Sequence, residues 1–196
     1  MPDRISVVIA DDAQLTIDGL RILLQNIGYI YVIAAAKTPR EVVELAKRIQ
    51  PNVIVIDLKW GGDEKVGAEL IGEIRKFSPV STVIAITAYP LLLPRAINAG
   101  ADVGLEKTFS RQELISTIRQ SDYKSRANRI ENTLVSLIRA SMNSRDVGQT
   151  NSLREKLADL RTAMVQLQAL DHEYNFQDHP AYNENRRRLL QRIHAI

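Results

Sequence analysis

The chain contains no cysteine among its 196 residues. Disulfide bonds, thiolate metal ligands and cysteine nucleophiles are therefore excluded, and a reducing compartment suits this composition. Long hydrophobic runs are also missing, because no apolar stretch approaches the roughly 18 residues of a membrane span. Residues 1–4 lead directly into a short apolar run without the layout of a signal peptide. These absences lead us to expect a cytoplasmic protein with no membrane segment.

A strong charge of one sign is lacking too, since the formal net charge is only +3. Residues 1–119 carry 14 Lys and Arg against 14 Asp and Glu, so the whole basic excess lies in residues 120–196. A mild bias spread over helices is typical of a solvated surface. We therefore do not expect nucleic acid to be a partner.

Two hydrophobic periods alternate along residues 1–119. The first is a short β-branched apolar run, typical of a strand buried on both faces, and it occurs at 5–10, 29–34, 53–56, 82–86 and 103–105. Helical spacing follows each run, at 15–27 with a stop at Gly28, then at 39–49, 68–77, 93–99 and 110–119. The alternation predicts an α/β fold with a doubly wound, five-stranded parallel sheet.

After Arg119 every apolar cluster has helical spacing, which predicts an all-helical extension over residues 120–196. The tract 110–142 is either one long helix or is interrupted at 120–129, where nearly all residues are polar and we expect solvent exposure or a break.

Further along, residues 143–151 form a polar break. Leucine and methionine then recur at coiled-coil spacing over 153–167, although two heptads fall short of a firm coiled-coil signature. A third helix is expected to begin at Asp178.

Three aspartates follow the predicted strands. Asp11 and Asp12 come directly after the first strand, and Asp57 ends the third. In a sheet of order 2-1-3-4-5 these strands are neighbours, so the three carboxylates converge at the carboxyl edge, where ligands bind. Like charges this close need a hard cation such as Mg²⁺, which prefers oxygen ligands. Helix capping would explain Asp12 but not the other two.

Thr87 ends the fourth strand and Lys107 follows the fifth, so both reach the same edge. A hydroxyl and an ammonium are complementary donors for phosphoryl oxygens. Positions on the ends of four strands are hard to obtain by accident, and the sequence therefore predicts a phosphoryl site.

These residues resemble the receiver domains of bacterial response regulators, which have the flavodoxin-like fold. The resemblance rests on the paired aspartates, the aspartate after Val53-Ile54-Val55-Ile56, Thr87-Ala88, and the lysine after Gly100-Ala101-Asp102. It implies that Asp57 accepts a phosphoryl group from a sensor histidine kinase. It also implies that Asp11, Asp12, Asp57 and the backbone carbonyl of Lys59 hold Mg²⁺, while Thr87 and Lys107 contact the phosphoryl oxygens. Such a domain catalyses only its own phosphorylation and dephosphorylation.

The chain departs from the family pattern at two positions near the lysine. Gly104 stands where an aromatic residue usually reports phosphorylation, so the usual coupling to Thr87 cannot operate, and Tyr89 is a candidate substitute. Thr108 stands where the family usually has proline. A cis bond before a non-proline costs roughly 2.5–4 kcal/mol, so we expect a trans Lys107–Thr108 bond.

The loop after Asp57 lacks the usual proline and is about two residues longer than the common form. Lys59 and Trp60 could alter access to the acceptor, or the loop could simply be flexible with solvated charges. The sequence is compatible with both interpretations.

Several functions compete for residues 120–196. A helical module for dimerisation or for docking an effector protein is preferred. A DNA-binding module is disfavoured because no helix-turn-helix spacing precedes the basic run at 186–188. His172-Glu173 is a weak signal for phosphotransfer, and a zinc site from His172, His179 and His194 is weaker still. The whole chain would then be a phosphorylation switch, a constitutive scaffold or a DNA-binding regulator.

Overall fold

The computed structural model describes residues 4–142 together with Thr162, Val165 and Ala169. Several sequence-based expectations lie outside the described residues. They are the break at 143–151, most of the coiled-coil spacing, the third helix, the three histidines and the arginine run at 186–188.

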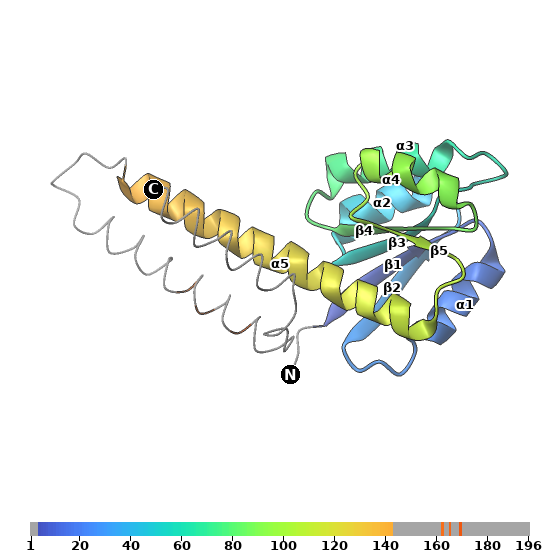
Figure 1. The fold of residues 1–196 in the computed structure, drawn as a ribbon, viewed down its shortest axis with the longest axis horizontal. Helices are drawn as coiled ribbons and strands as arrows, with labels where there is room; N and C mark the ends of the chain where they lie inside the picture. The colour runs from blue at the N-terminus through green and yellow to red at the C-terminus, as the bar shows by residue number, and fades with distance from the viewer. Residues whose placement is uncertain (1–3, 143–161, 163–164, 166–168, 170–196) are drawn as a thin grey trace. The chain divides into compact units, whose positions relative to one another are not determined.

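The described residues form a five-stranded parallel sheet alternating with helices (Figure 1). The strands are β1 (Ile5–Ala10), β2 (Ile30–Ala36), β3 (Val53–Asp57), β4 (Thr82–Thr87) and β5 (Val103–Glu106). The helices are α1 (Gln14–Leu24), α2 (Pro39–Ile49), α3 (Val66–Phe77), the short 3-10 helix η1 (Pro90–Leu92), α4 (Leu93–Asn98) and α5 (Arg111–Met142). The strand order is β2-β1-β3-β4-β5, which confirms the predicted doubly wound fold.

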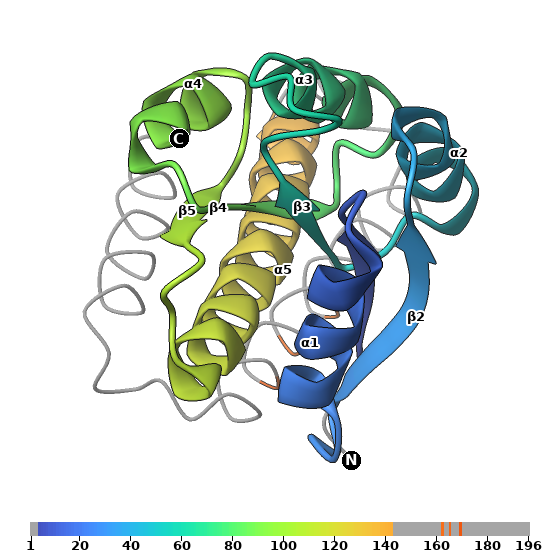
Figure 2. The ribbon, with the colours of Figure 1, turned by 90° about the vertical axis from the view of Figure 1, so that its right-hand side faces the viewer.

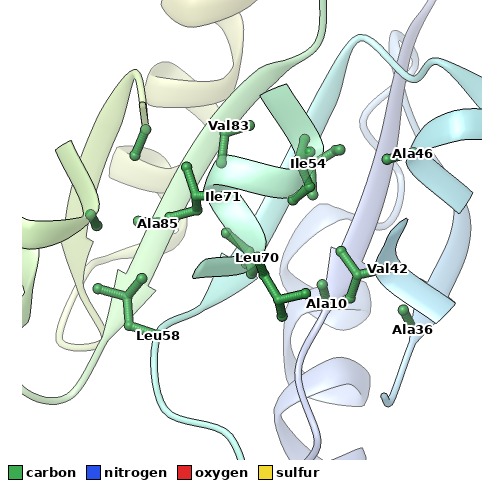
Figure 3. Close-up of a cluster of buried hydrophobic side chains, with 14 of the residues drawn as sticks. Ala10, Ala36, Val42, Ala46, Ile54, Leu58, Leu70, Ile71, Val83 and Ala85 are labelled. Carbon is green, nitrogen blue, oxygen red and sulfur yellow. The ribbon is translucent and has the colours of Figure 1, made fainter. Parts of the chain in front are cut away.

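Helices cover both faces of the sheet, with α2, α3 and α4 on one face and α1 and the start of α5 on the other (Figure 2). The central strands are apolar on both faces because alternate side chains enter two separate cores. One core lies beneath α2, α3 and α4 and includes Ile54, Ile71 and Val83 (Figure 3). Both faces of β3 and β4 are buried, which fixes their carboxyl ends rigidly at one edge.

The helix boundaries follow the sequence closely except at α1. Its apolar spacing predicts a helix to Ile27, but the helix ends at Leu24, and Gln25 is extended. The guanidinium of Arg111 donates to the carbonyl oxygens of Leu23 (2.8 Å) and Gln25 (3.1 Å), so a residue 86 positions away satisfies the helix end. A local pattern cannot reveal such a long-range cap.

The tract 110–142 forms one continuous helix from Arg111, which confirms the alternative of one long helix and makes the alternative with a break at 120–129 wrong. The expected solvent exposure is wrong in part, because Ser121, Asp122, Tyr123 and Ala127 are buried. Ser121 and Asp122 lie three and four residues after the buried Ile118, so helical periodicity places them on the same face as that core residue. The carbonyl of Ser121 accepts a hydrogen bond from Thr82 Oγ1 at 3.3 Å.

The chain divides into two compact units, Met1–Asp122 and Tyr123–Ile196. Within the described residues, no helix combines the length and apolar character that a membrane span requires.

Candidate functional site

Three carboxylates meet at the carboxyl edge of the sheet. Asp11 and Asp12 follow β1 and Asp57 ends β3, and these strands are paired, with Ala10 opposite Ile56. One carboxylate oxygen from each aspartate lies within 4.8 Å of the others. Asp11 and Asp57 are buried, whereas Asp12 is exposed. The structure therefore brings together the three aspartates that the sequence analysis singled out.

One ammonium joins the two buried carboxylates. Lys107 Nζ lies 2.8 Å from Asp11 Oδ2 and 2.9 Å from Asp57 Oδ1. Burial by itself lowers the pKa of Lys107, but the hydrogen bonds and negative charges of Asp11 and Asp57 outweigh it, and the net pKa is raised. Lys107 therefore stays protonated and offers a permanent positive charge beside Asp57.

Burial raises the pKa of Asp57 above its ordinary value. Hydrogen bonds from Lys107 and from the backbone N–H of Lys59 act in the opposite direction, and the negative charge of Asp11 adds to the rise. Burial therefore partly dehydrates the ionised Asp57 carboxylate, and this dehydration lowers the stability of the folded state. A group held this way is a candidate reactive residue.

Each carboxylate also accepts one hydrogen bond from a backbone N–H. The donors are Ala13 to Asp11 Oδ1 (2.8 Å), Lys59 to Asp57 Oδ2 (2.9 Å) and Gly61 to Asp12 Oδ2 (2.6 Å). The last of these bonds ties the β3–α3 loop to Asp12, the second residue after β1. The orientations of all three carboxylates are therefore set by the backbone.

Thr87 is fully buried at the end of β4, next to the acceptor strand. Its carbonyl oxygen accepts a hydrogen bond from the backbone N–H of Lys107 at 2.7 Å, and its Oγ1 accepts one from Tyr89 N–H at 3.0 Å. One residue thus fixes the backbone of the lysine and the course of the β4–α4 loop. The Lys107–Thr108 bond is trans, as no peptide bond in the described residues is cis.

The loop after Asp57 contains a hydrogen-bonded turn, and its charged residues Asp63, Glu64 and Lys65 are exposed, as the interpretation with solvated charges predicts. Trp60 and Asp63 exchange two backbone hydrogen bonds of 3.1 and 2.8 Å across Gly61 and Gly62. Both glycines have positive φ, 57° and 87°, as a type I′ turn requires. The Trp60 ring is buried, and its Nε1 donates to the carbonyl oxygen of Asp57 at 2.8 Å. The extra loop residues thus brace the acceptor.

The Leu93 side chain lies against Gly104, the position where the family usually has an aromatic residue. A Cβ added at Gly104 would lie 2.8 Å from Leu93 Cδ2, which is too close for any real contact. Leu93, the first residue of α4, packs against the core on this side of the sheet. In this chain the Leu93 side chain therefore packs directly against Gly104.

Sequence reasoning missed one contact at the mouth of the site. Lys59 Nζ donates to the Tyr89 hydroxyl at 3.1 Å and lies 4.3 Å from the centre of the ring. This bond joins the β3–α3 loop to the β4–α4 loop, and it raises the pKa of Lys59. Lys59 stands two positions after Asp57, and Tyr89 stands two positions after Thr87. That spacing alone does not reveal a contact between Lys59 and Tyr89.

The donor set fits a hard divalent cation. The three carboxylates offer oxygen ligands only, and exposed Asp12 leaves room for the waters that Mg²⁺ retains. A single ammonium against three carboxylates leaves excess negative charge at this edge, which a divalent cation would offset.

Comparison with known proteins agrees with this geometry. Residues 7–119 match the family model described as the response regulator receiver domain. The transcriptional regulatory protein DesR of Bacillus subtilis is 26% identical over 166 residues, which cover 76% of this chain and 82% of DesR. NarL of Mycobacterium tuberculosis, a probable transcriptional regulatory protein, is 27% identical over 119 residues, covering 60% of this chain and 54% of NarL. The chain thus spans about half the length of NarL.

Solved structures give the same result. The signal receiver domain of NarL from Mycobacterium tuberculosis has a TM-score of 0.55 and 26% identity, covering 62% of this chain and 98% of that one. A DNA-binding response regulator of the LuxR family from Staphylococcus aureus has a TM-score of 0.53 and 26% identity, covering 60% of this chain and 98% of that one. Since such relatives are named as transcriptional regulators, the comparisons give no support to the expectation against nucleic acid. The chain belongs to the response regulator receiver domain family of two-component signalling proteins.

Proposed function

We propose that this protein is a two-component response regulator that accepts a phosphoryl group on Asp57 from a sensor histidine kinase. The observation that carries the proposal is the buried Asp57 carboxylate, which Lys107 Nζ contacts at 2.9 Å while Asp11 and Asp12 lie beside it. In our assignment residues 1–119 are the receiver domain and 120–196 are the output segment.

The reaction requires one bond to form and one to break. A carboxylate oxygen of Asp57 attacks the phosphorus of a phosphohistidine, the P–N bond breaks, and the leaving imidazole nitrogen keeps the electron pair. The N–H of Lys59 and the ammonium of Lys107 keep the attacking carboxylate oriented. Water later attacks the same phosphorus, the P–O bond to Asp57 breaks, and inorganic phosphate leaves as the Asp57 carboxylate is restored. We infer no activity on other substrates.

Lys107 and Thr87 would bind the transferred group. The ammonium already faces Asp57, and the Thr87 hydroxyl lies at the end of the neighbouring strand. Charge-assisted hydrogen bonds of this kind are roughly twice as strong as neutral ones, so they favour the charged phosphoryl group in place.

Asp11, Asp12, Asp57 and the backbone carbonyl of Lys59 would hold Mg²⁺. Bound there, the ion supplies positive charge to the attacking carboxylate and to the incoming phosphoryl oxygens. The protein's part is to keep the carboxylate oxygens within 4.8 Å of one another, through the backbone donors of Ala13, Lys59 and Gly61.

Fluorescence of Trp60, the single tryptophan, tests the proposal. Its indole N–H is bonded to the Asp57 carbonyl oxygen, so beryllofluoride with Mg²⁺ should quench its emission. Asp57→Ala should abolish the response while keeping the tryptophan. An emission unchanged by beryllofluoride in the wild-type chain would contradict the proposal.

The output has two candidates. We favour a helical segment that controls dimerisation or docks an effector protein, since α5 continues to Met142 as one helix. DNA binding is the second candidate, because similarity to the transcriptional regulator DesR extends over 166 residues. Binding of the full chain to mixed-sequence DNA, measured against salt concentration, separates them, because phosphate contacts make affinity fall steeply with salt.

A constitutive scaffold remains the alternative to a switch, motivated by Gly104 and Thr108. Light scattering with and without beryllofluoride separates the two. A switch that acts through dimerisation changes its mass, whereas a scaffold keeps the same mass in both conditions.

A further inference from the structure

Tyr89 is held at the edge of the site by two polar partners. Its backbone N–H donates to Thr87 Oγ1 at 3.0 Å, and its hydroxyl accepts from Lys59 Nζ at 3.1 Å. The same ammonium lies 4.3 Å from the centre of the Tyr89 ring. Both partners stand beside Asp57, one on the neighbouring strand and one in the loop that follows it.

We propose that Tyr89, Lys59 and Thr87 form a latch that phosphorylation of Asp57 opens. The Lys59 ammonium would then turn from Tyr89 to the phosphoryl group and bind it together with the Lys107 ammonium. This inference rests on the proposed phosphorylation of Asp57. In this proposal Lys59 and Tyr89 transmit the phosphorylation state of Asp57 to residues 89–97.

The competition for Lys59 favours the phosphoryl group. Lys59 N–H donates to Asp57 Oδ2 at 2.9 Å, so the residue is anchored at the acceptor and its side chain extends from there to Tyr89. An exposed ammonium gains little from a phenol and an aromatic face. A charged phosphoryl oxygen is a much stronger acceptor for the same ammonium.

The second contact weakens in the same event. Oγ1 of Thr87 accepts from Tyr89 N–H, and a turn of this hydroxyl toward a phosphoryl oxygen moves Oγ1 away from that donor. Phosphorylation therefore withdraws both partners from one residue. Tyr89 would lose its backbone contact and its side-chain contact together.

Residues after Tyr89 would respond. Leu92 N–H donates to the Tyr89 carbonyl oxygen at 2.9 Å, so Tyr89 begins the turn that leads through η1 into α4. This segment exposes Leu91 (93%) and Ile97 (45%). Gly104 has no side chain that could report phosphorylation, whereas Tyr89 is 45% exposed at the edge of the site.

Hydrogen–deuterium exchange of residues 88–98 in the full chain tests the latch. In Lys59→Met the segment should exchange about two- to fivefold faster than in wild type without any phosphoryl mimic, the factor expected for one exposed cation–π contact. Beryllofluoride with Mg²⁺ should accelerate the same segment in wild type, and by a smaller factor in Lys59→Met, where only the contact of Tyr89 with Thr87 is left to release. Tyr89→Phe, which keeps the ring, should be intermediate.

The chain offers matched controls. Lys47 lies 5.5 Å from the ring centre of Phe77 at the end of α2, so Lys47→Met removes a lysine–aromatic pair that is not at the site. Tyr31→Phe removes a hydroxyl that donates to the Gly28 carbonyl oxygen. Neither change should alter exchange of residues 88–98.

The outcomes separate the latch from the proposed function. Wild-type exchange rates in Lys59→Met, or a full beryllofluoride response in that variant, would overturn the latch. Quenching of Trp60 without faster exchange of residues 88–98 in wild type would also overturn the latch, but it would leave phosphorylation intact. No response of Trp60 at all would overturn the proposed function itself.

Discussion

Lys107 Nζ bridges Asp11 and Asp57, at 2.8 and 2.9 Å, so one partly buried ammonium serves two buried carboxylates. Asp12 adds a third carboxylate that this ammonium does not contact. The balance of these charges sets how the folded protein responds to pH, to Mg²⁺ and to substitution.

Asp57→Asn should stabilise the folded chain at neutral pH. The pKa of Asp57 is raised by burial, so the folded state binds the proton more tightly than the unfolded state. This contribution to stability is complete below the ordinary aspartate pKa and is lost as the pH rises through the folded pKa. We expect a melting temperature about 2–4 °C higher for the variant at pH 7.

The same linkage predicts how that difference depends on pH. Because the proton is bound in both states in acid, the gap between Asp57→Asn and wild type should close toward pH 4. Thermal denaturation from pH 4 to pH 8 measures it. A gap that widens toward acid would contradict the raised pKa.

Lys107→Met should destabilise the chain without Mg²⁺ by about 2 kcal/mol, because two buried carboxylates lose their shared ammonium. Adding Mg²⁺ should recover part of this loss, since the cation offsets the same charges. Urea denaturation with and without Mg²⁺ measures both effects. Lys76→Met is the control, because its ion pair with Glu73 is largely exposed and contributes little.

Mg²⁺ should raise the wild-type melting temperature through Asp12. At 100 times its dissociation constant a ligand of the folded state adds about 2.7 kcal/mol. Asp12→Ala should abolish most of this shift, while Asp18→Ala, which removes an exposed carboxylate in α1, should retain it. An equal Mg²⁺ shift in both variants would place the ion elsewhere.

Gly67→Ala should disrupt the acceptor loop. An added Cβ would lie 2.5 Å from the Cα and carbonyl oxygen of Leu58, which is rigid backbone next to Asp57. We expect a loss of about 1–3 kcal/mol. Gly72→Ala in the same helix is the matched control, because a Cβ there meets nothing within 4 Å and alanine favours the helix. Equal stability of the two variants would contradict the close packing.

Gly104→Tyr should cost about 1–3 kcal/mol, because Leu93 fills the space beside it. Combining it with Leu93→Ala should cost less than the sum of the two single changes, by about 1 kcal/mol. Chemical denaturation of the wild type, the two single variants and the double variant measures this coupling as a double-mutant cycle. Strict additivity would show that Leu93 and position 104 do not compete for space.

Sequence patterns predict the sheet and the convergence of the site well, because both follow from short-range periodicity. The strand order places Asp11 and Asp57 on paired strands, and their meeting follows from the topology. Contacts between distant loops carry no such periodicity. The Arg111 cap on α1 and the Lys59–Tyr89 bond each join side chains that no local pattern relates.

The polar stretch of α5 shows a second limit. Polarity alone suggested exposure or a break, yet Asp122 is buried within a continuous helix. The face that a helix buries is fixed by packing, so polarity alone does not decide which residues of a helix are exposed. Likewise, the sequence of the loop after Asp57 does not reveal that Gly61 and Gly62 form a tight turn around which Trp60 and Asp63 pair.

The central claim is that Asp57 accepts a phosphoryl group. Incubating the full chain with acetyl phosphate and Mg²⁺, followed by intact mass spectrometry, measures this directly. We predict one added phosphoryl group per chain, which requires Mg²⁺, is absent in Asp57→Asn and is removed by hydroxylamine as an acyl phosphate. An unmodified wild-type chain, or equal modification of Asp57→Asn, would contradict the account.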